Sequence, residues 1–342
     1  MRRTLAVLMG GRSSEHEVSL SSAEAVIAAL DPEHYDVVPV LISREGGWSV
    51  AGAPVALVPA PDGTPRLASL DGGEERRLDA VFPVLHGPNG EDGTVQGALE
   101  TAGAPYVGAG VAASAIAMDK AMFKVFLRDA GIATPEHWVV TDAEWRARPD
   151  DVRARVAERV GYPAFCKPAR LGSSVGISPV PDEDDLERAL ALALRHDSKA
   201  LVERAVDGRE VEVGVLGEEE PVVSPVGEIT YDSEWYDYAT KYEPGRSRVE
   251  VPADLPGPVS ERCRELALRG FRAVDCAGLA RVDFFVEGDE VLLSELNTIP
   301  GFTPTSVYAK LMEAGGIAYP DLVDRLVDLA IARAAEARRY AG

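Results

Sequence analysis

Cysteine is scarce in this sequence. Only three cysteines, Cys166, Cys263 and Cys276, occur among 342 residues, and their spacing matches neither a disulfide framework nor a zinc site. A disulfide-stapled protein is therefore excluded, and the pattern favours a reducing compartment. We expect a cytoplasmic protein.

Positive charge is also in deficit. The chain has 35 lysines and arginines against 56 aspartates and glutamates, which gives a formal net charge of −21. A field of this sign repels phosphate backbones and anionic lipids, so we expect neither a nucleic-acid partner nor a membrane partner. Any anionic ligand must be held by local cations.

Long apolar runs are missing as well. The apolar run Leu5–Met9 is far too short for a signal peptide, and no other run is long enough to cross a bilayer. We interpret the run Leu5–Met9 as part of a buried first strand. With 46% hydrophobic and 27% charged residues, the composition is that of a soluble globular protein, and the length predicts two or three domains.

Strands and helices alternate in the first third of the chain. Strands are predicted at 4–9, 36–42 and 79–85, with a helix at 18–30 and a loosely specified hairpin or loop region at 44–76. This alternation predicts an open, mostly parallel sheet. Such sheets bind their ligands in the loops at the carboxyl ends of the strands.

Two residues in these loops are candidate site residues. Glu15 follows the first strand and faces either an amine-bearing substrate or the dipole of the next helix. We prefer the dipole for its neighbour Glu17 and the site for Glu15. His86 follows the third predicted strand and is either a site residue or a structural histidine that caps the strand.

The middle of the chain has the elements of a phosphate clamp. Lys120 lies in a helix predicted over residues 112–129, and Lys167 lies on a strand predicted over 162–168. The small-residue loop 172–176 follows that strand. Fixed cations and closely approaching backbone N–H groups are what a phosphate requires, although a Gly-Ser loop alone is weak evidence.

Acidic residues and an aromatic segment follow. Glu203 could accept a hydrogen bond from an adenine amine and Glu210 from ribose hydroxyls, but each could equally be a surface charge. The segment 234–242 combines aromatic and charged residues, a composition typical of lids that close over a site and exclude water.

The stretch 281–306 begins with a predicted β-hairpin. Apolar runs at 282–286 and 291–293 flank the turn-forming residues 288–290. Pairing of Glu287 with Val291 would put two further pairs of residues on one face of the hairpin. These pairs are Asp283 with Glu295 and Arg281 with Asn297.

The polar face of this hairpin is a candidate metal site. Asp283, Glu295 and Asn297 offer two carboxylates and an amide oxygen, which suit Mg²⁺ bridging nucleotide phosphates. A solvated polar face is the alternative. Against it, the two carboxylates lie in apolar surroundings, where a charge needs a partner or a metal.

The order of these features resembles that of the ATP-grasp ligases. Within that superfamily the sequence is most similar to the D-alanine–D-alanine ligases, and the similarity covers nearly the whole chain. Six runs carry it: EHEVSL at 15–20, HGPNGEDG at 86–93, KPARLGSSVG at 167–176, YDYATKY at 236–242, RVDFF at 281–285 and ELNTIPGFTPTS at 295–306.

The resemblance implies a mixed α/β and α+β fold in three domains. An N-terminal open parallel, Rossmann-like α/β domain (1–113) would precede a two-domain ATP-grasp fold. That fold would comprise a central subdomain with the Gly-Ser loop (114–212) and a C-terminal subdomain with the lid and the metal site (213–342).

The resemblance also implies the ligands. ATP as co-substrate, two Mg²⁺ or Mn²⁺ ions and D-alanine are expected, with a monovalent cation as an optional addition and a homodimer as the assembly. The metal ligands would be Asp283, Glu295 and Asn297. The ATP site would consist of Lys120, Lys167, Ser173, Ser174, Glu203, Val206, Glu210 and Lys241. The substrate and catalytic residues would be Glu15, His86, Ser173, Tyr236, Tyr242, Arg281, Gly301 and Ser306.

Two alternatives are open at this point. The first is a ligase of the same fold that joins D-alanine to D-lactate; relatives of that kind lack the tyrosine that stands here as Tyr242, which favours the amine substrate. The second is a nucleotide-binding regulator without catalysis. Such a protein should have lost Arg281 or a metal ligand, and the sequence retains them all.

Overall fold

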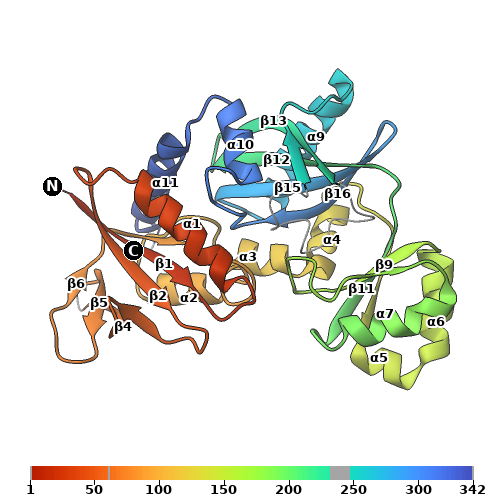
Figure 1. Cartoon of the computed structure of the whole chain (residues 1–342), viewed down its shortest axis with the longest axis horizontal. Helices are drawn as coiled ribbons and strands as arrows, with labels where there is room; N and C mark the ends of the chain where they lie inside the picture. The colour runs from red at the N-terminus through yellow and green to blue at the C-terminus, as the bar shows by residue number, and fades with distance from the viewer. Residues whose placement is uncertain (1, 61, 232–246, 341–342) are drawn as a thin grey trace.

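The computed structural model describes residues 2–60, 62–231 and 247–340. Within these residues the strands form three sheets, of seven, four and five strands, arranged along the chain from the first to the third (Figure 1). Tyr236, Lys241 and Tyr242, with the rest of the predicted lid, lie outside the described residues.

The first sheet has a parallel centre, as predicted. Its strand order is β6-β5-β4-β3-β2-β1-β7, in which β1 (Arg3–Gly10) pairs in parallel with both β2 (Tyr35–Ile42) and β7 (Ala80–Pro83). The region predicted as a loosely specified hairpin or loop forms four short strands in consecutive antiparallel pairs that extend this sheet. They are β3 (Trp48–Val50), β4 (Ala53–Pro59), β5 (Pro65–Ser69) and β6 (Arg76–Arg77).

Helices cover both faces of the parallel centre. Residues of β1 alternate between two buried clusters, with Leu5 packed toward α1 (His16–Ala29) and α11 (Tyr319–Ala337), and Ala6 toward α2 (Thr94–Thr101). A central strand is therefore apolar on both faces. The last helix of the chain returns to the first sheet, where α11 lies beside α1 (Figure 1).

One predicted helix is divided in two in the structure. Residues 112–129 form two helices, α3 (Val111–Met118) and α4 (Lys120–Asp129), separated at Asp119. The Asp119 backbone is extended, and its side chain accepts hydrogen bonds from the N–H groups of residues 121 and 122. An aspartate in that role starts a new helix, and it places Lys120 in the first turn of α4.

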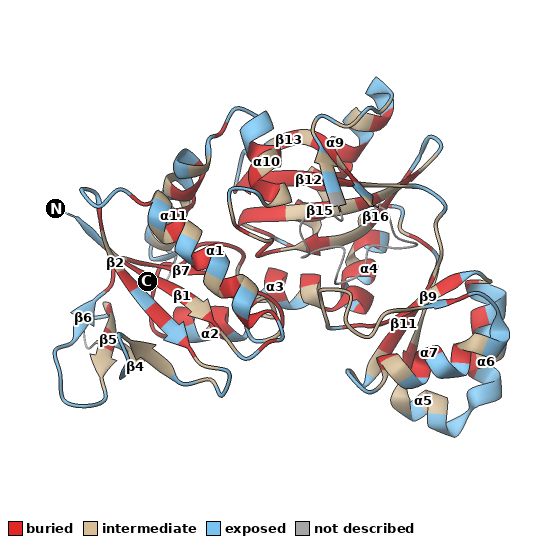
Figure 2. Cartoon of the chain, in the orientation of Figure 1, coloured by how far each residue is buried: buried red, intermediate tan, exposed pale blue. Residues whose placement is uncertain are grey.

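The second sheet is antiparallel, with the strand order β10-β9-β11-β8. Helices pack against it over a buried apolar cluster, and their outer surfaces are exposed (Figure 2). The strands are β8 (His137–Thr141), β9 (Ala164–Pro168), β10 (Ser178–Val180) and β11 (Lys199–Arg204), and the helices are α5 (Asp142–Ala147), α6 (Pro149–Arg159) and α7 (Leu186–Ala193).

The third sheet is also antiparallel, with the order β14-β13-β12-β15-β16. α9 (Gly257–Ala273) packs with α3 and α4 over one buried cluster, while α10 (Val307–Ala314) contacts β12 and β13. The strands are β12 (Arg209–Gly217), β13 (Val222–Tyr231), β14 (Ser247–Glu250), β15 (Gly278–Glu287) and β16 (Glu290–Asn297).

The hairpin of β15 and β16 has the predicted pairing at the site but a different register at the turn. At the turn, Glu287 pairs with Glu290 rather than with Val291, so the predicted turn register is wrong by one residue. A bulge at Ser294 then adds one residue to β16. Beyond the bulge Asp283 lies opposite Glu295 and Arg281 opposite Asn297, as predicted.

Gly10, at the end of β1, gives a test of the close packing between β1 and the end of β2. Its φ is +86°, and a Cβ atom there would lie 2.5 Å from the Ile42 carbonyl oxygen. We expect Gly10→Ala to lower the free energy of unfolding by about 3 kcal/mol through strain and overpacking. Gly52→Ala is the matched control, because Gly52 has a φ of +84° and no atom within 4 Å of the added Cβ. Equal melting temperatures for the two variants would contradict the packing described.

Candidate active site

Two neighbouring cavities lie at the junction of the sheets. The larger has a volume of about 720 Å³ and the smaller about 320 Å³. Lys120, Ser174, Arg281 and Glu295 line both of them. Every predicted site residue that the structure describes lines at least one of the two, so the fold brings the described part of the predicted set together.

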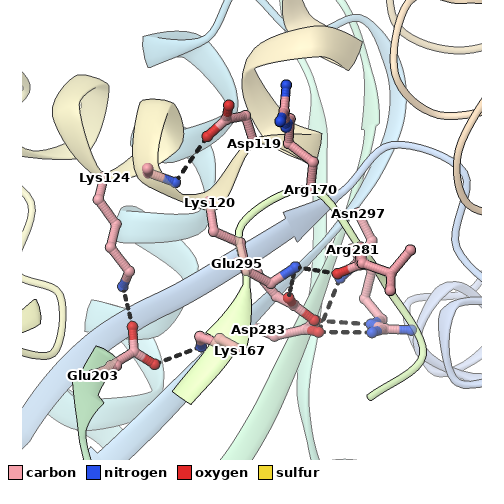
Figure 3. A network of polar contacts seen from close by, with 12 residues as sticks. Asp119, Lys120, Lys124, Lys167, Arg170, Glu203, Arg281, Asp283, Glu295 and Asn297 are labelled. Carbon is pink, nitrogen blue, oxygen red and sulfur yellow. Dashed lines mark hydrogen bonds and ion pairs between the residues drawn. The ribbon is translucent and has the colours of Figure 1, made fainter. Parts of the chain in front are cut away.

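Lysines and carboxylates both line the smaller cavity, and Figure 3 shows several of them side by side. Lys167 on β9 pairs with Leu201 on β11. Glu203 lies two residues after Leu201, so its side chain is on the same face of the sheet as that of Lys167. Lys167 Nζ donates to Glu203 Oε1 at 2.6 Å. The other oxygen, Oε2, lies 2.6 Å from Nζ of Lys124, a lysine of α4 that is 1% exposed.

Glu203 is ionised in spite of its burial. Burial by itself would raise the pKa of this carboxyl, but the charges of Lys124 and Lys167 outweigh that effect and lower the pKa to about 2. Burial lowers the pKa of Lys124, against the opposing charge of Glu203. One buried carboxylate thus lies between two buried lysines beside the cavity. Val206 and Glu210 line the same cavity, and Glu210 accepts a hydrogen bond from the Tyr231 hydroxyl.

The predicted metal ligands converge where the cavities meet. Asp283 accepts two hydrogen bonds from Arg281, at 2.8 and 2.7 Å, and a third from Asn297 Nδ2 at 2.9 Å (Figure 3). Lys120 Nζ lies 3.3 Å from Glu295 Oε2. Arg281 also pairs with Glu212 of β12 at 2.9 Å. Each carboxylate of this cluster therefore has a cation beside it.

The donor set fits a cation shared with phosphates rather than an all-protein cage. Over residues 2–60, 62–231 and 247–340, no group of three or more His, Cys, Asp or Glu side chains is placed to hold a metal ion. Two carboxylates and one amide are hard donors, and Mg²⁺ is commonly bound by one or two carboxylates together with phosphates and water. The residues present fit Mg²⁺ or Mn²⁺ in that mode.

Glu15 connects the first sheet to the Gly-Ser loop. It precedes α1, is buried, and accepts a hydrogen bond from the Ser173 hydroxyl. The resemblance to the ligases implies this contact, with Tyr242 as its third member. Ser173 and Ser174 both have positive φ, at 54° and 58°, which turns the loop toward the cavities. Glu17, in the first turn of α1, is exposed and pairs with Arg44, and it too lines the larger cavity.

His86 is held by both ring nitrogens. Nδ1 is 3.0 Å from the Ile299 carbonyl oxygen, and Nε2 is 3.2 Å from the hydroxyl of Ser22, which also accepts from the Phe302 N–H. Burial lowers the pKa of this imidazole. His86 lines the larger cavity and at the same time fastens the segment after β16 to the first sheet.

Glu91 also holds the segment after β16 against the first sheet, through the N–H of Ile299. One carboxyl oxygen accepts from the Ile299 N–H at 3.1 Å and the other from the Gly87 N–H at 2.7 Å. Ile299 is thus held at both its N–H and its carbonyl. The next residues include Gly301 and Ser306, which line the larger cavity, and the Ser306 hydroxyl accepts from the N–H of Thr303 at 3.0 Å.

Sequence reasoning missed Lys124, Glu91, Glu212 and Ser22. A signal existed for Glu91, which stands in the quoted run HGPNGEDG, and for Lys124, which lies one helical turn after Lys120 on the same face. Glu212 sits in a regular alternating strand, where a solvated charge is the usual interpretation. Ser22 carried no signal, because a serine within an ordinary amphipathic helix is common.

The fold and the site together define an ATP-grasp ligase. A Rossmann-like sheet adjoins two antiparallel sheets, and between them lysines and hard oxygen donors line connected cavities. Family models give the narrower assignment: the D-ala D-ala ligase N-terminus model matches residues 4–109 and the D-ala D-ala ligase C-terminus model matches residues 126–328.

Individual relatives agree with these models. The D-alanine–D-alanine ligase of Deinococcus radiodurans is 51% identical and that of Geobacillus kaustophilus 44%; each alignment covers 97% of this chain, with 99% and 96% of the relative. Among solved structures, the ligase from Coxiella burnetii has a TM-score of 0.88 at 33% identity, covering 99% of this chain and 97% of the other. The chain belongs to the D-alanine–D-alanine ligase family, and it is an enzyme.

A second similar structure has a different second substrate in its name. The VanG D-Ala:D-Ser ligase from Enterococcus faecalis has a TM-score of 0.87 at 34% identity, covering 96% of this chain and all of the other. The fold therefore does not by itself determine the second substrate. Among the described helices, none has the length and apolar character needed to cross a membrane.

Glu91 gives a pH-dependent test of the site. Burial, followed by the charge of Glu15, raises the pKa of Glu91 from its ordinary value of 4.5 to about 8. The native state then keeps a proton that the unfolded chain releases, so this contribution to stability is complete below pH 4.5 and is lost as the pH rises to about 8. Glu91→Gln removes one acceptor and the titration, so we expect a lower melting temperature at pH 6 and a shrinking difference from wild type toward pH 9.

The control for this experiment is Glu24→Gln, which makes the same chemical change at an exposed position of α1. It should follow the wild-type melting temperature at every pH. A constant difference between Glu91→Gln and wild type from pH 6 to pH 9 would contradict the raised pKa.

Proposed function

We propose that this enzyme joins two D-alanine molecules to D-alanyl-D-alanine for peptidoglycan precursor synthesis, with conversion of ATP to ADP and phosphate. Membership of the ligase family supports the reaction. The observation that carries the assignment in this chain is the meeting of the two cavities at Lys120, Arg281 and Glu295. A nucleotide in one cavity and an amino acid in the other would react at that junction.

The smaller cavity is proposed as the nucleotide site. Lys120 and Lys167 would hold the phosphates, Glu203 would accept from the adenine amine, and Glu210 would accept from the ribose. Local cations are necessary here, because the net charge of −21 otherwise repels a nucleoside triphosphate. The remaining proposed contacts are those of Ser173, Ser174, Val206 and Lys241.

Asp283, Glu295 and Asn297 are proposed to hold two Mg²⁺ or Mn²⁺ ions against the phosphates. When bound, such ions supply charge neutralisation at the transferred phosphoryl group. Arg281 and Lys120 already lie against these carboxylates, so the charge of the cluster is nearly balanced before any ligand enters. A monovalent cation as a further activator remains a prediction.

The larger cavity is proposed as the site of both D-alanines. Glu15 would face the ammonium of the first, with His86 beside it, and Ser306 would hold the carboxylate of the second. Arg281 and the Gly301 N–H would face the oxyanion. Tyr236 and Tyr242 complete the proposed substrate set from outside the described residues.

The first step is the activation of a carboxylate. One carboxylate oxygen of the first D-alanine attacks the γ-phosphorus of ATP, which forms D-alanyl phosphate and releases ADP. Lys120 and Lys167 lower the repulsion between two anions at this step. An acyl phosphate hydrolyses in open water, so exclusion of water from the site is part of the catalytic task.

The second step forms the peptide bond. The second D-alanine loses its ammonium proton, and its amine attacks the acyl carbon. The tetrahedral oxyanion would be stabilised by Arg281 and the Gly301 N–H before phosphate leaves. Removal of one such donor typically lowers the rate by roughly 10² to 10³-fold. His86 and Glu91 hold the segment that carries Gly301, so they act on this step through its position.

Three further features are proposed with the activity. The domains would divide at about residues 113 and 212, the second of these within the first half of β12, with α11 packed back on the first domain. The assembly would be a homodimer, as the resemblance to the family implies. The location would be the cytoplasm, which is consistent with three buried free cysteines and the use of ATP.

A product assay tests the activity and the second substrate together. The enzyme would be given ATP, Mg²⁺ and equal amounts of D-alanine, D-lactate and D-serine, with L-alanine as the control, and the products identified by mass spectrometry. We expect D-alanyl-D-alanine with one ADP and one phosphate per dipeptide, because Tyr242 favours an amine over a hydroxy acid and membership of the ligase family favours D-alanine. A depsipeptide or D-alanyl-D-serine as the main product would overturn the specificity, and no ADP at all would overturn the reaction.

The metal assignment is tested at Glu295. Glu295→Gln removes one anionic ligand and leaves the size of the side chain unchanged, so we expect kcat to fall at least about 100-fold. Glu290→Gln is the matched control on the same strand, because Glu290 is exposed at the turn. An unchanged rate for Glu295→Gln across a Mg²⁺ titration would show that Glu295 is not a ligand.

A further inference from the structure

Lys124 is a buried lysine with no place in the reaction as described so far. It extends from α4 and is 1% exposed, and neither cavity lining includes it among the described residues (Figure 3). Lysine is almost never fully buried unless it is paired. Its Nζ lies 2.6 Å from Glu203 Oε2 and donates to the Thr134 hydroxyl.

Glu203 divides its two oxygens between two lysines. Oε1 faces Lys167, which lines the smaller cavity, and Oε2 faces Lys124, which lies behind the cavity wall. The two contacts have the same length, 2.6 Å. The carboxylate is therefore held by one cation within reach of a ligand and one cation beyond its reach.

A bound nucleotide would compete for the hydrogen bond between Lys167 and Glu203. Lys167 is needed by the phosphates and Glu203 by the adenine amine, yet each of them is the hydrogen-bond partner of the other in the structure. When a nucleotide draws Lys167 toward its phosphates, Glu203 would be left as a buried carboxylate without a counter-charge if Lys124 were absent. Without Lys124, Glu203 would either take up a proton or keep Lys167 as its partner, away from the phosphates.

We infer that Lys124 is a positioning residue for the nucleotide: it holds Glu203 as an ionised acceptor for the adenine amine and so releases Lys167 to the phosphates. Lys124 touches neither substrate in this arrangement. Its effect is on base selection, because an ionised carboxylate accepts from the 6-amino group of adenine and repels the 6-carbonyl oxygen of hypoxanthine. The inference rests on the proposed function.

The experiment compares ATP with inosine triphosphate in the ligation of D-alanine. We expect wild type to prefer ATP and Lys124→Met to lower kcat/KM for ATP, with a smaller loss for inosine triphosphate. The ratio of the two kcat/KM values should fall about tenfold or more, the size of one hydrogen bond to a charged group. Thr134→Val is the matched control, because it removes the other partner of Lys124 and leaves the charge; its ratio should stay at the wild-type value.

A purely structural Lys124 would behave differently. It would lower kcat/KM for both nucleotides by the same factor, and that result would overturn the inference. Because Lys124→Met leaves a buried charge without one partner, the variant combined with Glu203→Gln, which has no such charge, is measured beside Glu203→Gln alone. The two should have the same nucleotide ratio; a further change on adding Lys124→Met would also overturn the inference.

The outcome separates this inference from the proposed function. No dipeptide from wild type with ATP would refute the ligase activity itself. Dipeptide formation with equal use of ATP and inosine triphosphate would leave the activity intact and refute the role of Glu203, and with it that of Lys124. An unchanged ratio in an active Lys124→Met variant would refute the role of Lys124 alone.

Discussion

Charge compensation in a partly buried site is the constraint on which the structure depends. The site contains several carboxylates, and ionised groups removed from water are costly unless cations or hydrogen-bond donors face them. Here the partners come from different parts of the chain: Glu203 of β11 faces α4, and Glu295 of β16 faces Lys120 at the start of α4. Glu15, between β1 and α1, faces the Gly-Ser loop. Each pair fixes one element relative to another, so the same contacts that satisfy the charges also align the three sheets.

This arrangement also accounts for a nucleotide-using enzyme with a net charge of −21. The long-range field disfavours anions, while the cavity walls present Lys120, Lys167 and Arg281 at short range. Before a ligand enters, the carboxylates of the site hold these cations in place. An anionic substrate then meets cations that are already oriented, and little reorganisation is needed.

The sequence predicted the elements that follow a periodic pattern and the residues that stand in recognisable runs. The β15 and β16 pairing was correct at Asp283 and Glu295, although the turn register was wrong, because a bulge at Ser294 compensates for the shorter turn. The number and bounds of the strands within residues 44–76 were not predicted, since short half-exposed strands carry weak alternation. The break at Asp119 was missed because an apolar helical pattern continues through it, and only the capping hydrogen bonds distinguish it.

Residues that act through other residues were the least predictable. Glu91 and Ser22 are defined by backbone groups of residues 299 and 302, more than 200 positions away, and no local pattern encodes such a contact. Lys124 of α4 has its role through an ion pair with Glu203 on β11, 79 positions away in the sequence. The proposed contacts of Lys241, Tyr236 and Tyr242 stay predictions, because these residues lie outside the described part of the chain.

The return of α11 to the first sheet affects the order in which the protein can fold during synthesis. One buried cluster contains Leu5 and Val7 of β1 together with Leu322 and Leu326 of α11. While the ribosome is still making the middle of the chain, that face of the first sheet lacks its cover. Contacts between the two ends of a sequence close slowly, and exposed apolar strands are prone to aggregation in the meantime. The N-terminal part is thus the first to be made and among the last to be completed.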